Sequence, residues 1–178
     1  MGKLTFKYGV MGAAKTAEAL ICKHRYETLG QKVLLLKPRM AVRDGEKNLK
    51  SRIGLCEEAE ILEDFLSEPL CERMIKVSTY SLVIVDEVQF ASKTCIDLLS
   101  DIVDEVGTNV CCYGLKTDYK GELFEGSKRL LEIADSIREI DTVCKCGKKA
   151  TMNVKISNDK DDRKAKYISV CRKCYKNY

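Results

Sequence analysis

Short apolar runs separated by polar segments recur along the first part of the chain. Residues 33–36 and 81–85 are almost continuously apolar, as in strands buried within a parallel sheet, and residues 4–8 alternate apolar with polar positions. Residues 15–29 are rich in helix formers, and the following Gly30 is a common residue just past a helix end. Strands that alternate with helices predict βαβ units and a mostly parallel sheet.

Farther along, the same alternation continues less regularly. Residues 39–54 are polar and predict a loop, whereas residues 57–70 have the period of an amphipathic helix. Residues 95–106 predict another helix and residues 110–113 another strand. These elements extend the same α/β pattern.

From Cys144 onward the chain is bounded by cysteines and rich in lysine, with short β-prone runs at residues 151–156 and 167–170. The change in character predicts a division near Thr142. We expect a larger α/β domain at residues 1–141 and a small module at residues 142–178.

The segment between the first strand and the first helix has the composition of a phosphate-binding loop. Such a loop needs small residues that let backbone N–H groups approach the phosphates, a lysine, a hydroxyl for Mg²⁺ and the positive end of a helix. Ala14 departs from the strict pattern, which has glycine there, and a turn of this composition can also be a simple connection. The residues predicted to bind ATP here are Gly9, Val10, Met11, Gly12, Ala13, Ala14, Lys15 and Thr16.

Two acids, Asp86 and Glu87, follow the clearest buried strand. In P-loop proteins an acid at this position holds Mg²⁺ opposite the loop hydroxyl, and a second acid can accept a proton from the attacking nucleophile. Acid pairs at strand ends are common, but this pair follows the loop in the right order, about 70 residues later. The two motifs together predict a P-loop NTPase fold, RecA-like, with a mostly parallel sheet flanked by helices.

Four of the ten cysteines form two tight pairs, Cys144 with Cys146 and Cys171 with Cys174. Two thiolate pairs joined by a hairpin match a tetrahedral structural Zn²⁺ site, and the alternative is four free surface thiols. The other six are expected to be buried as small apolar side chains: Cys22, Cys56, Cys71, Cys95, Cys111 and Cys112.

Composition narrows the range of partners. The net charge of +4 is mild, and basic residues are interleaved with acids, so we expect no nucleic-acid partner. The chain has neither a long apolar run nor the features of a secretory signal, which predicts a cytoplasmic protein without a membrane partner.

Several short segments occur in an order that gives the chain a family resemblance. They are residues 8–11 (YGVM), 30–33 (GQKV), 51–54 (SRIG), 85–90 (VDEVQF), 113–127 (YGLKTDYKGELFEGS) and 167–175 (YISVCRKCY). With these segments the chain resembles the type II thymidine kinases along nearly its whole length, and the segment at 113–127 is the most specific of them.

The resemblance implies a kinase of nucleotide salvage and DNA synthesis that transfers the γ-phosphoryl group of ATP to the 5′-hydroxyl of thymidine or deoxyuridine. It implies that Glu87 is the general base and that Lys15 steadies the transferring group, while Thr16 and Asp86 serve Mg²⁺. It also assigns a run after the strand to ATP and Mg²⁺: Asp86, Glu87, Val88 and Gln89.

The same resemblance implies a homotetramer and a pocket for a pyrimidine deoxynucleoside. An aromatic residue beside a βα loop packs in the core as often as on a ligand, and for Phe124 both interpretations stay open. The residues implied to pack around the nucleoside are Met11, Phe90, Leu115, Tyr119, Phe124 and Tyr167.

Three departures from the family pattern leave alternatives open. They are Ala14, the pair Ala41 and Val42 where the family has aspartates, and a short segment at 153–166 without paired glycines. The chain is therefore expected to be an active deoxynucleoside kinase or, alternatively, a catalytically weak or inactive thymidine-kinase-like protein that binds nucleotide. Lysines around Cys174 suggest a third and less favoured hypothesis, a zinc ribbon that binds nucleic acid.

Overall fold

A parallel six-stranded sheet forms the centre of the computed structural model, which describes residues 2–41, 47–157, 159 and 165–178. The strand order is β5-β2-β6-β7-β1-β8, and every neighbouring pair is parallel. The strands are β1 (Leu4–Tyr8), β2 (Val33–Lys37), β5 (Glu60–Ile61), β6 (Leu82–Val85), β7 (Asn109–Gly114) and β8 (Ser136–Glu139). The predicted parallel α/β fold is confirmed.

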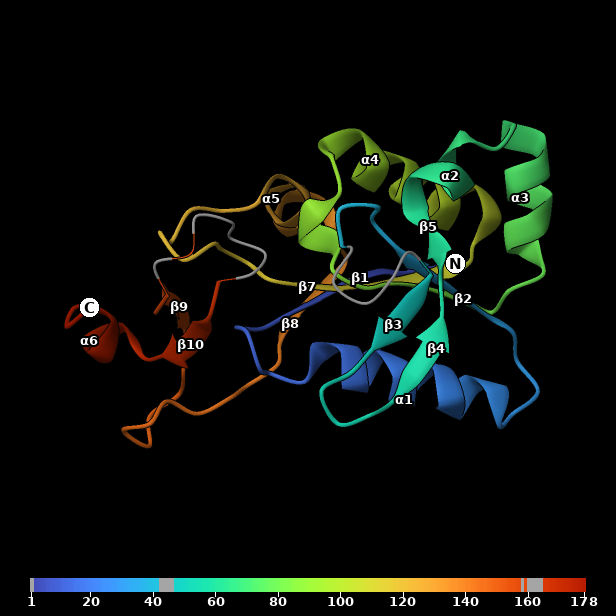
Figure 1. Ribbon diagram of the computed structural model, residues 1–178. Helices are drawn as coiled ribbons and strands as arrows, with labels where there is room; N and C mark the ends of the chain where they lie inside the picture. The colour runs from blue at the N-terminus through green and yellow to red at the C-terminus, as the bar shows by residue number, and fades with distance from the viewer. Residues whose placement is uncertain (1, 42–46, 158, 160–164) are drawn as a thin grey trace.

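Helices cover both faces of this sheet (Figure 1). Helix α1 (Lys15–Glu27) packs on one face through Ala19 and Leu20. The other face carries α2 (Leu62–Ser67), α3 (Leu70–Ser78), α4 (Lys93–Asp101) with its π-helical continuation η3 (Ile102–Val106), and α5 (Glu125–Ile133). Within the described residues, no helix is long and apolar enough to cross a membrane.

The middle strands explain why the apolar runs were informative. Every residue of β2 and β6 is buried, and their registers align Val33 with Leu82 and Leu36 with Val85. A strand with helices on both faces has no solvent-facing side, so its sequence is almost wholly apolar. The exception is Lys37 at the end of β2, whose Nζ donates to the Asn48 carbonyl at 3.0 Å.

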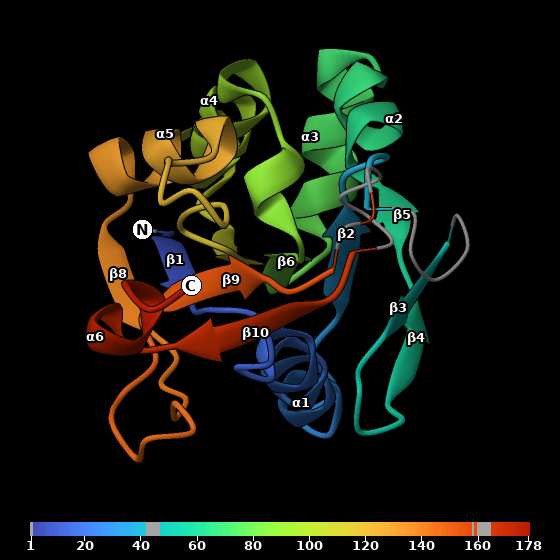
Figure 2. The same ribbon diagram turned by 60° about the vertical axis from the view of Figure 1, so that its left-hand side comes forward.

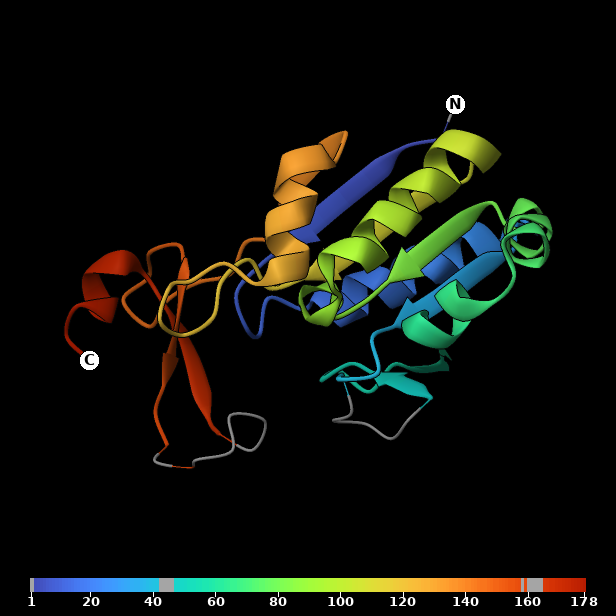
Figure 3. The ribbon, with the colours of Figure 1, turned by 90° about the horizontal axis from the view of Figure 1, so that it is seen from above.

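The C-terminal residues form a small β unit beyond the carboxyl ends of the sheet strands (Figures 2 and 3). An antiparallel pair, β9 (Met152–Lys155) and β10 (Tyr167–Val170), is followed by the short helix α6 (Arg172–Tyr175). Its own apolar cluster contains Val154, Val170 and two of the paired cysteines. The two β-prone runs expected here are confirmed, whereas the division near Thr142 stays a prediction.

The helix predicted over residues 57–70 is wrong for its first part. Strand β4 (Cys56–Glu58) pairs with β3 (Asn48–Lys50), inside the predicted loop, and β5 pairs with the end of β2. Within this range α2 is helical and Leu70 begins α3, because pairing with β3 and with β2 overrides the local helical period in the first part. The elements α3, α5 and β8 were not predicted.

Burial of the six unpaired cysteines is only partly confirmed. Cys111 and Cys112 are buried in β7, but Cys56 and Cys71 are exposed. The prediction failed for these two because Cys56 belongs to a peripheral hairpin and Cys71 lies on the outer side of α3.

Candidate active site

The predicted phosphate-binding loop connects β1 to α1 at the carboxyl end of the sheet. Helix α1 begins at Lys15 without a side-chain cap, so the amides of its first turn have no acceptor within the helix and face the loop. Aligned peptide dipoles add positive potential at this end of α1. The loop therefore offers N–H groups and positive potential to an anion.

Ala14 has a left-handed backbone, with φ of 58°, and Gly12 has φ of 78°. Left-handed geometry costs a residue with a Cβ roughly 1–2 kcal/mol, whereas glycine adopts it freely. The loop thus keeps the shape that glycine usually supports and carries strain at Ala14.

Replacing Ala14 with glycine is expected to stabilise the chain by about 0.5–1 kcal/mol, since relief of strain exceeds the added freedom of the unfolded chain. Urea unfolding of the two proteins measures this difference. The control is Ala13→Gly, because Ala13 is buried and is not among the residues with positive φ, so that change should destabilise. Equal destabilisation by both changes would contradict strain at Ala14.

Lys15 is nearly buried at 9% exposure, and its Nζ donates to the Val10 carbonyl at 2.9 Å. Burial lowers the pKa of Lys15, the charges of Glu87 and Asp86 oppose that effect, and Arg52 lowers it further. The ammonium group is thus held inside the loop, close to both acids.

Thr16 and Asp86 meet across the sheet end, with the Thr16 hydroxyl donating to Asp86 Oδ2 at 2.6 Å. Asp86 is 1% exposed, and among the described residues its Oδ1 has no hydrogen-bond partner. Burial, with the adjacent charge of Glu87, raises the pKa of Asp86 to about 7. A buried carboxylate oxygen without a donor, beside a threonine hydroxyl, fits a Mg²⁺ site.

Substituting Asp86 with asparagine should show how much the burial of an ionised carboxylate lowers the free energy of unfolding. The folded pKa of about 7 exceeds the ordinary 3.8, so the folded state holds more protons between these pH values. Stability of the nucleotide-free protein therefore falls as pH rises from about 4 to about 7. We expect Asp86→Asn to be more stable than the unmodified protein at pH 8, on the order of a few kcal/mol, with the gap shrinking toward pH 5. Parallel pH profiles in thermal unfolding would refute this.

Glu87 is oriented by a buried glutamine. Gln89 Nε2 donates to Glu87 Oε2 at 2.6 Å, and Gln89 Oε1 accepts the Leu115 N–H at 3.0 Å. The backbone amide defines which end of Gln89 is the acceptor, so the other end must donate to Glu87. A Cβ at Gly114 would lie 2.6 Å from Gln89 Oε1, and the glycine therefore leaves room for this bridge.

Val88 is wholly buried in the main core, and Gln89 is 2% exposed. The described contacts of Gln89 support Glu87 and the Leu115 backbone. The assignment of Val88 and Gln89 to ATP and Mg²⁺ stays a prediction.

The four aromatic residues predicted to surround a nucleoside form two pairs. Phe90 packs edge-on against Phe124 with ring centres 5.9 Å apart, and Tyr119 lies 6.1 Å from Tyr167. Leu115 is buried and Met11 half-buried. Val42, and residues 158 and 160–164 of the short segment, lie outside the described residues.

Arg52 is a cationic residue of this region that the sequence analysis did not single out. It lies between β3 and β4, and a Cβ at Gly12 would stand 3.7 Å from its Nη1. Its charge also acts on Lys15. Arg52 belongs to the SRIG segment at residues 51–54, but nothing in the local sequence indicates that this loop reaches Gly12.

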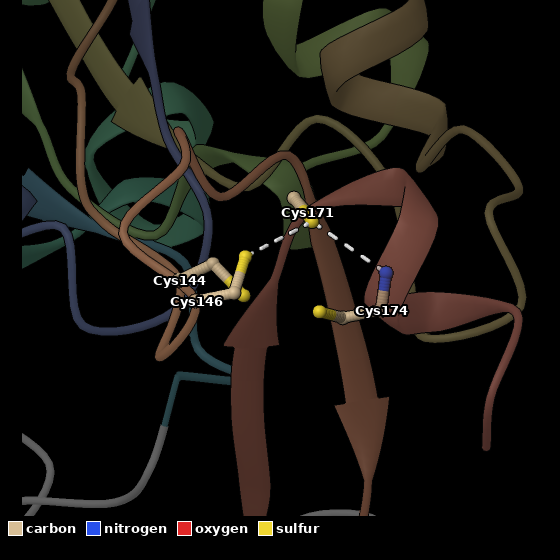
Figure 4. Close-up of side chains that lie close together, drawn as sticks. All are labelled: Cys144, Cys146, Cys171 and Cys174. Atoms are coloured by element: carbon tan, nitrogen blue, oxygen red, sulfur yellow. Dashed lines mark hydrogen bonds between the residues drawn. The ribbon is translucent and has the colours of Figure 1, made fainter.

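The four paired cysteines gather at one end of the β9–β10 unit (Figure 4). Their Sγ atoms all lie within 4.8 Å of one another, with 3.6 Å between Cys146 and Cys171. A tetrahedral zinc with Zn–S bonds of about 2.3 Å separates sulfurs by about 3.8 Å, so the donor set fits Zn²⁺. N–H groups of Cys146 and Cys171 lower the pKa of Cys144 to about 6, which favours the thiolate that zinc binds.

A glycine- and alanine-rich loop with its lysine, facing a strand-end carboxylate pair on a parallel sheet, defines a P-loop protein that binds nucleoside triphosphates. The sequence pattern of the thymidine kinases matches residues 2–175. The chain belongs to the thymidine kinase family, and the resemblance inferred from its motifs is confirmed.

Relatives from a phage and from bacteria match most or nearly all of the chain. The thymidine kinase of Enterobacteria phage T4 is 40% identical over 183 residues, covering 97% of this chain and 95% of its own. That of Francisella tularensis subsp. holarctica (strain LVS) is 38% identical, with 99% and 98% covered. That of Xanthomonas oryzae pv. oryzae (strain MAFF 311018) is 44% identical, with 88% and 76% covered.

Proposed function

We propose that this protein transfers the γ-phosphoryl group of ATP to the 5′-hydroxyl of thymidine or deoxyuridine. The observation that carries the proposal is the gathering of Lys15, Thr16, Asp86 and Glu87 in one region of a chain that belongs to the thymidine kinase family. Phosphoryl transfer depends mainly on positioning and charge stabilisation, and these residues supply both.

In this proposal, each group has a role set by its place. Lys15 exchanges the Val10 carbonyl for a phosphate oxygen, and the first-turn amides of α1 hold the neighbouring phosphates. Glu87, held by Gln89 through Oε2, presents Oε1 to the 5′-hydroxyl and takes its proton as the oxygen attacks the γ-phosphorus. Arg52 adds positive charge beside Gly12, where the phosphates enter.

Thr16 and the unpartnered Oδ1 of Asp86 would hold Mg²⁺. When bound, this ion neutralises charge on the β- and γ-phosphates. The four cysteines would hold a structural Zn²⁺. Two aromatic pairs and Met11 would enclose the pyrimidine. Phe90, which directly follows Gln89 in sequence, contributes one pair together with Phe124.

Incubation with labelled ATP and each of thymidine, deoxyuridine, deoxycytidine and deoxyadenosine tests the proposal. We expect 5′-monophosphates from the first two alone. Product from a purine deoxynucleoside only, or no product from any, would refute the substrate class.

A second candidate function is nucleotide binding with little or no turnover, favoured by the strained φ of 58° at Ala14 and by Ala41 in place of an acid. Assaying Ala14→Gly beside the unmodified chain separates the two. Turnover by either protein supports the kinase, whereas Mg·ADP binding with turnover by neither supports the second candidate.

The family resemblance also supports a homotetramer in the cytoplasm. Light scattering on the purified chain gives its mass in solution directly. A mass of four chains would agree with this proposal, and a monomer at micromolar concentration would contradict it.

A further inference from the structure

The C-terminal hairpin makes hydrogen bonds to both backbone groups of one residue in the phosphate-binding loop. Asn153 of β9 accepts the Met11 N–H through Oδ1 at 2.9 Å. Ser169 of β10 donates its hydroxyl to the Met11 carbonyl. Both backbone hydrogen-bonding groups of Met11 are thus held by the hairpin.

The pairing of β9 with β10 places the two side chains that make these contacts. Asn153 and Ser169 are direct partners in the β9–β10 register, so their side chains reach the loop from the same place. Asn153 is 2% exposed, and a hydrogen bond shielded in this way is not exchanged readily for water. The partners are 142 and 158 residues from Met11 in sequence.

Packing joins the same loop to the cysteine cluster. Val10 lies against the apolar cluster that contains Cys144, Val170 and Cys171. Cys171 immediately follows the last residue of β10. Loop, hairpin and cysteines are therefore one continuous packed unit.

We infer that Asn153 and Ser169 are positioning residues that fix the phosphate-binding loop, so that nucleotide affinity depends on the C-terminal hairpin. This rests on the proposed function in one respect, that the loop binds a nucleotide. The Met11 N–H is committed to Asn153 and the Ala13 N–H donates to the Val10 carbonyl at 3.2 Å, which leaves phosphate binding to the amides of Gly12 and of residues from Ala14 onward. The two hydrogen bonds to Met11 form a clamp that holds the start of that amide series in place.

The test measures Mg·ADP affinity by calorimetry on the zinc-loaded full chain, without nucleoside. Asn153→Ala and Ser169→Ala should each weaken binding about fivefold, the effect of losing one hydrogen bond. The double variant should lose less affinity than the product of the two single losses, because both bonds hold the same residue, Met11. Ser169→Thr keeps the hydroxyl and should restore affinity.

The matched control is Tyr175→Phe, which removes another hydrogen bond between the module and the main domain, from the Tyr175 hydroxyl to the Tyr119 carbonyl at 2.8 Å. We expect it to leave Mg·ADP affinity unchanged. Zinc content and the thermal midpoint, measured on every variant, show that each is folded.

Unchanged affinity in Asn153→Ala and Ser169→Ala would overturn the inference, as would equal weakening by Tyr175→Phe, which would indicate loosened docking in general. An unmodified chain that binds no Mg·ADP would overturn it as well. A chain that binds Mg·ADP, responds to the clamp variants and phosphorylates no nucleoside would support the clamp while refuting the proposed function.

Discussion

Substitution of Glu87 by glutamine is expected to lower the turnover number for thymidine by about 10²–10⁴-fold, the range for loss of a general base. Glutamine has nearly the same shape and can still accept the Gln89 hydrogen bond, so the site should keep its geometry. What is lost is the capacity to take the hydroxyl proton. Steady-state formation of labelled thymidine monophosphate at saturating ATP measures the effect.

Two controls accompany this change. Mg·ADP affinity should stay close to that of the unmodified chain, and Glu72→Gln, which alters an exposed carboxylate on α3, should leave turnover unaffected. Turnover of the Glu87 variant within tenfold of the unmodified chain would remove Glu87 from the role of base.

Loss of one cysteine ligand is expected to have the second large effect. Cys171→Ser should abolish zinc retention, and because structural zinc binding contributes about 10–16 kcal/mol in small zinc domains, the β9–β10 unit should lose its ordered structure. Cys171 also accepts the Cys174 N–H at the start of α6, so a single change removes both contacts. Metal content after gel filtration and the thermal midpoint report the outcome.

A matched cysteine lies outside the cluster. Cys71 is exposed on α3, so Cys71→Ser should retain one zinc per chain with an unchanged midpoint. If Cys171→Ser kept its zinc, the four-thiolate site would be wrong.

The sequence predicted the parts of the fold in which a single physical cause dominates. Strands β2 and β6 could be located because complete burial makes their positions apolar, apart from Lys37 at the end of β2. Residues 57–70 could not, because β5 pairs with β2 more than twenty residues earlier, and β4 pairs with β3 inside a segment whose polar composition predicts a loop. Helix α3 follows Pro69, a helix-start signal that could have been used.

At the site, the sequence predicted which residues carry the chemistry, but it did not predict the contacts that hold them in place. Lys15 and Asp86 stand at motif positions, whereas the left-handed backbone of Glu87 follows from tertiary structure. The reach of Asn153 to Met11 has no local signal, because an asparagine on a short strand is equally compatible with a solvent-facing position. The residues expected to carry the chemistry can be recognised from local motifs, but the residues that hold them in place cannot.

The position of β1 in the sheet has a consequence for how the chain folds. This first strand lies between two late ones, with Leu4 opposite Val110 and Thr5 opposite Ser136. During synthesis β1 leaves the ribosome long before either partner exists, so it has no strand neighbour until β7 has been made and lacks its second one until β8 follows. Contacts so distant in sequence slow folding, and the arrival of β7 and β8, rather than helix formation, should limit the rate at which this sheet closes.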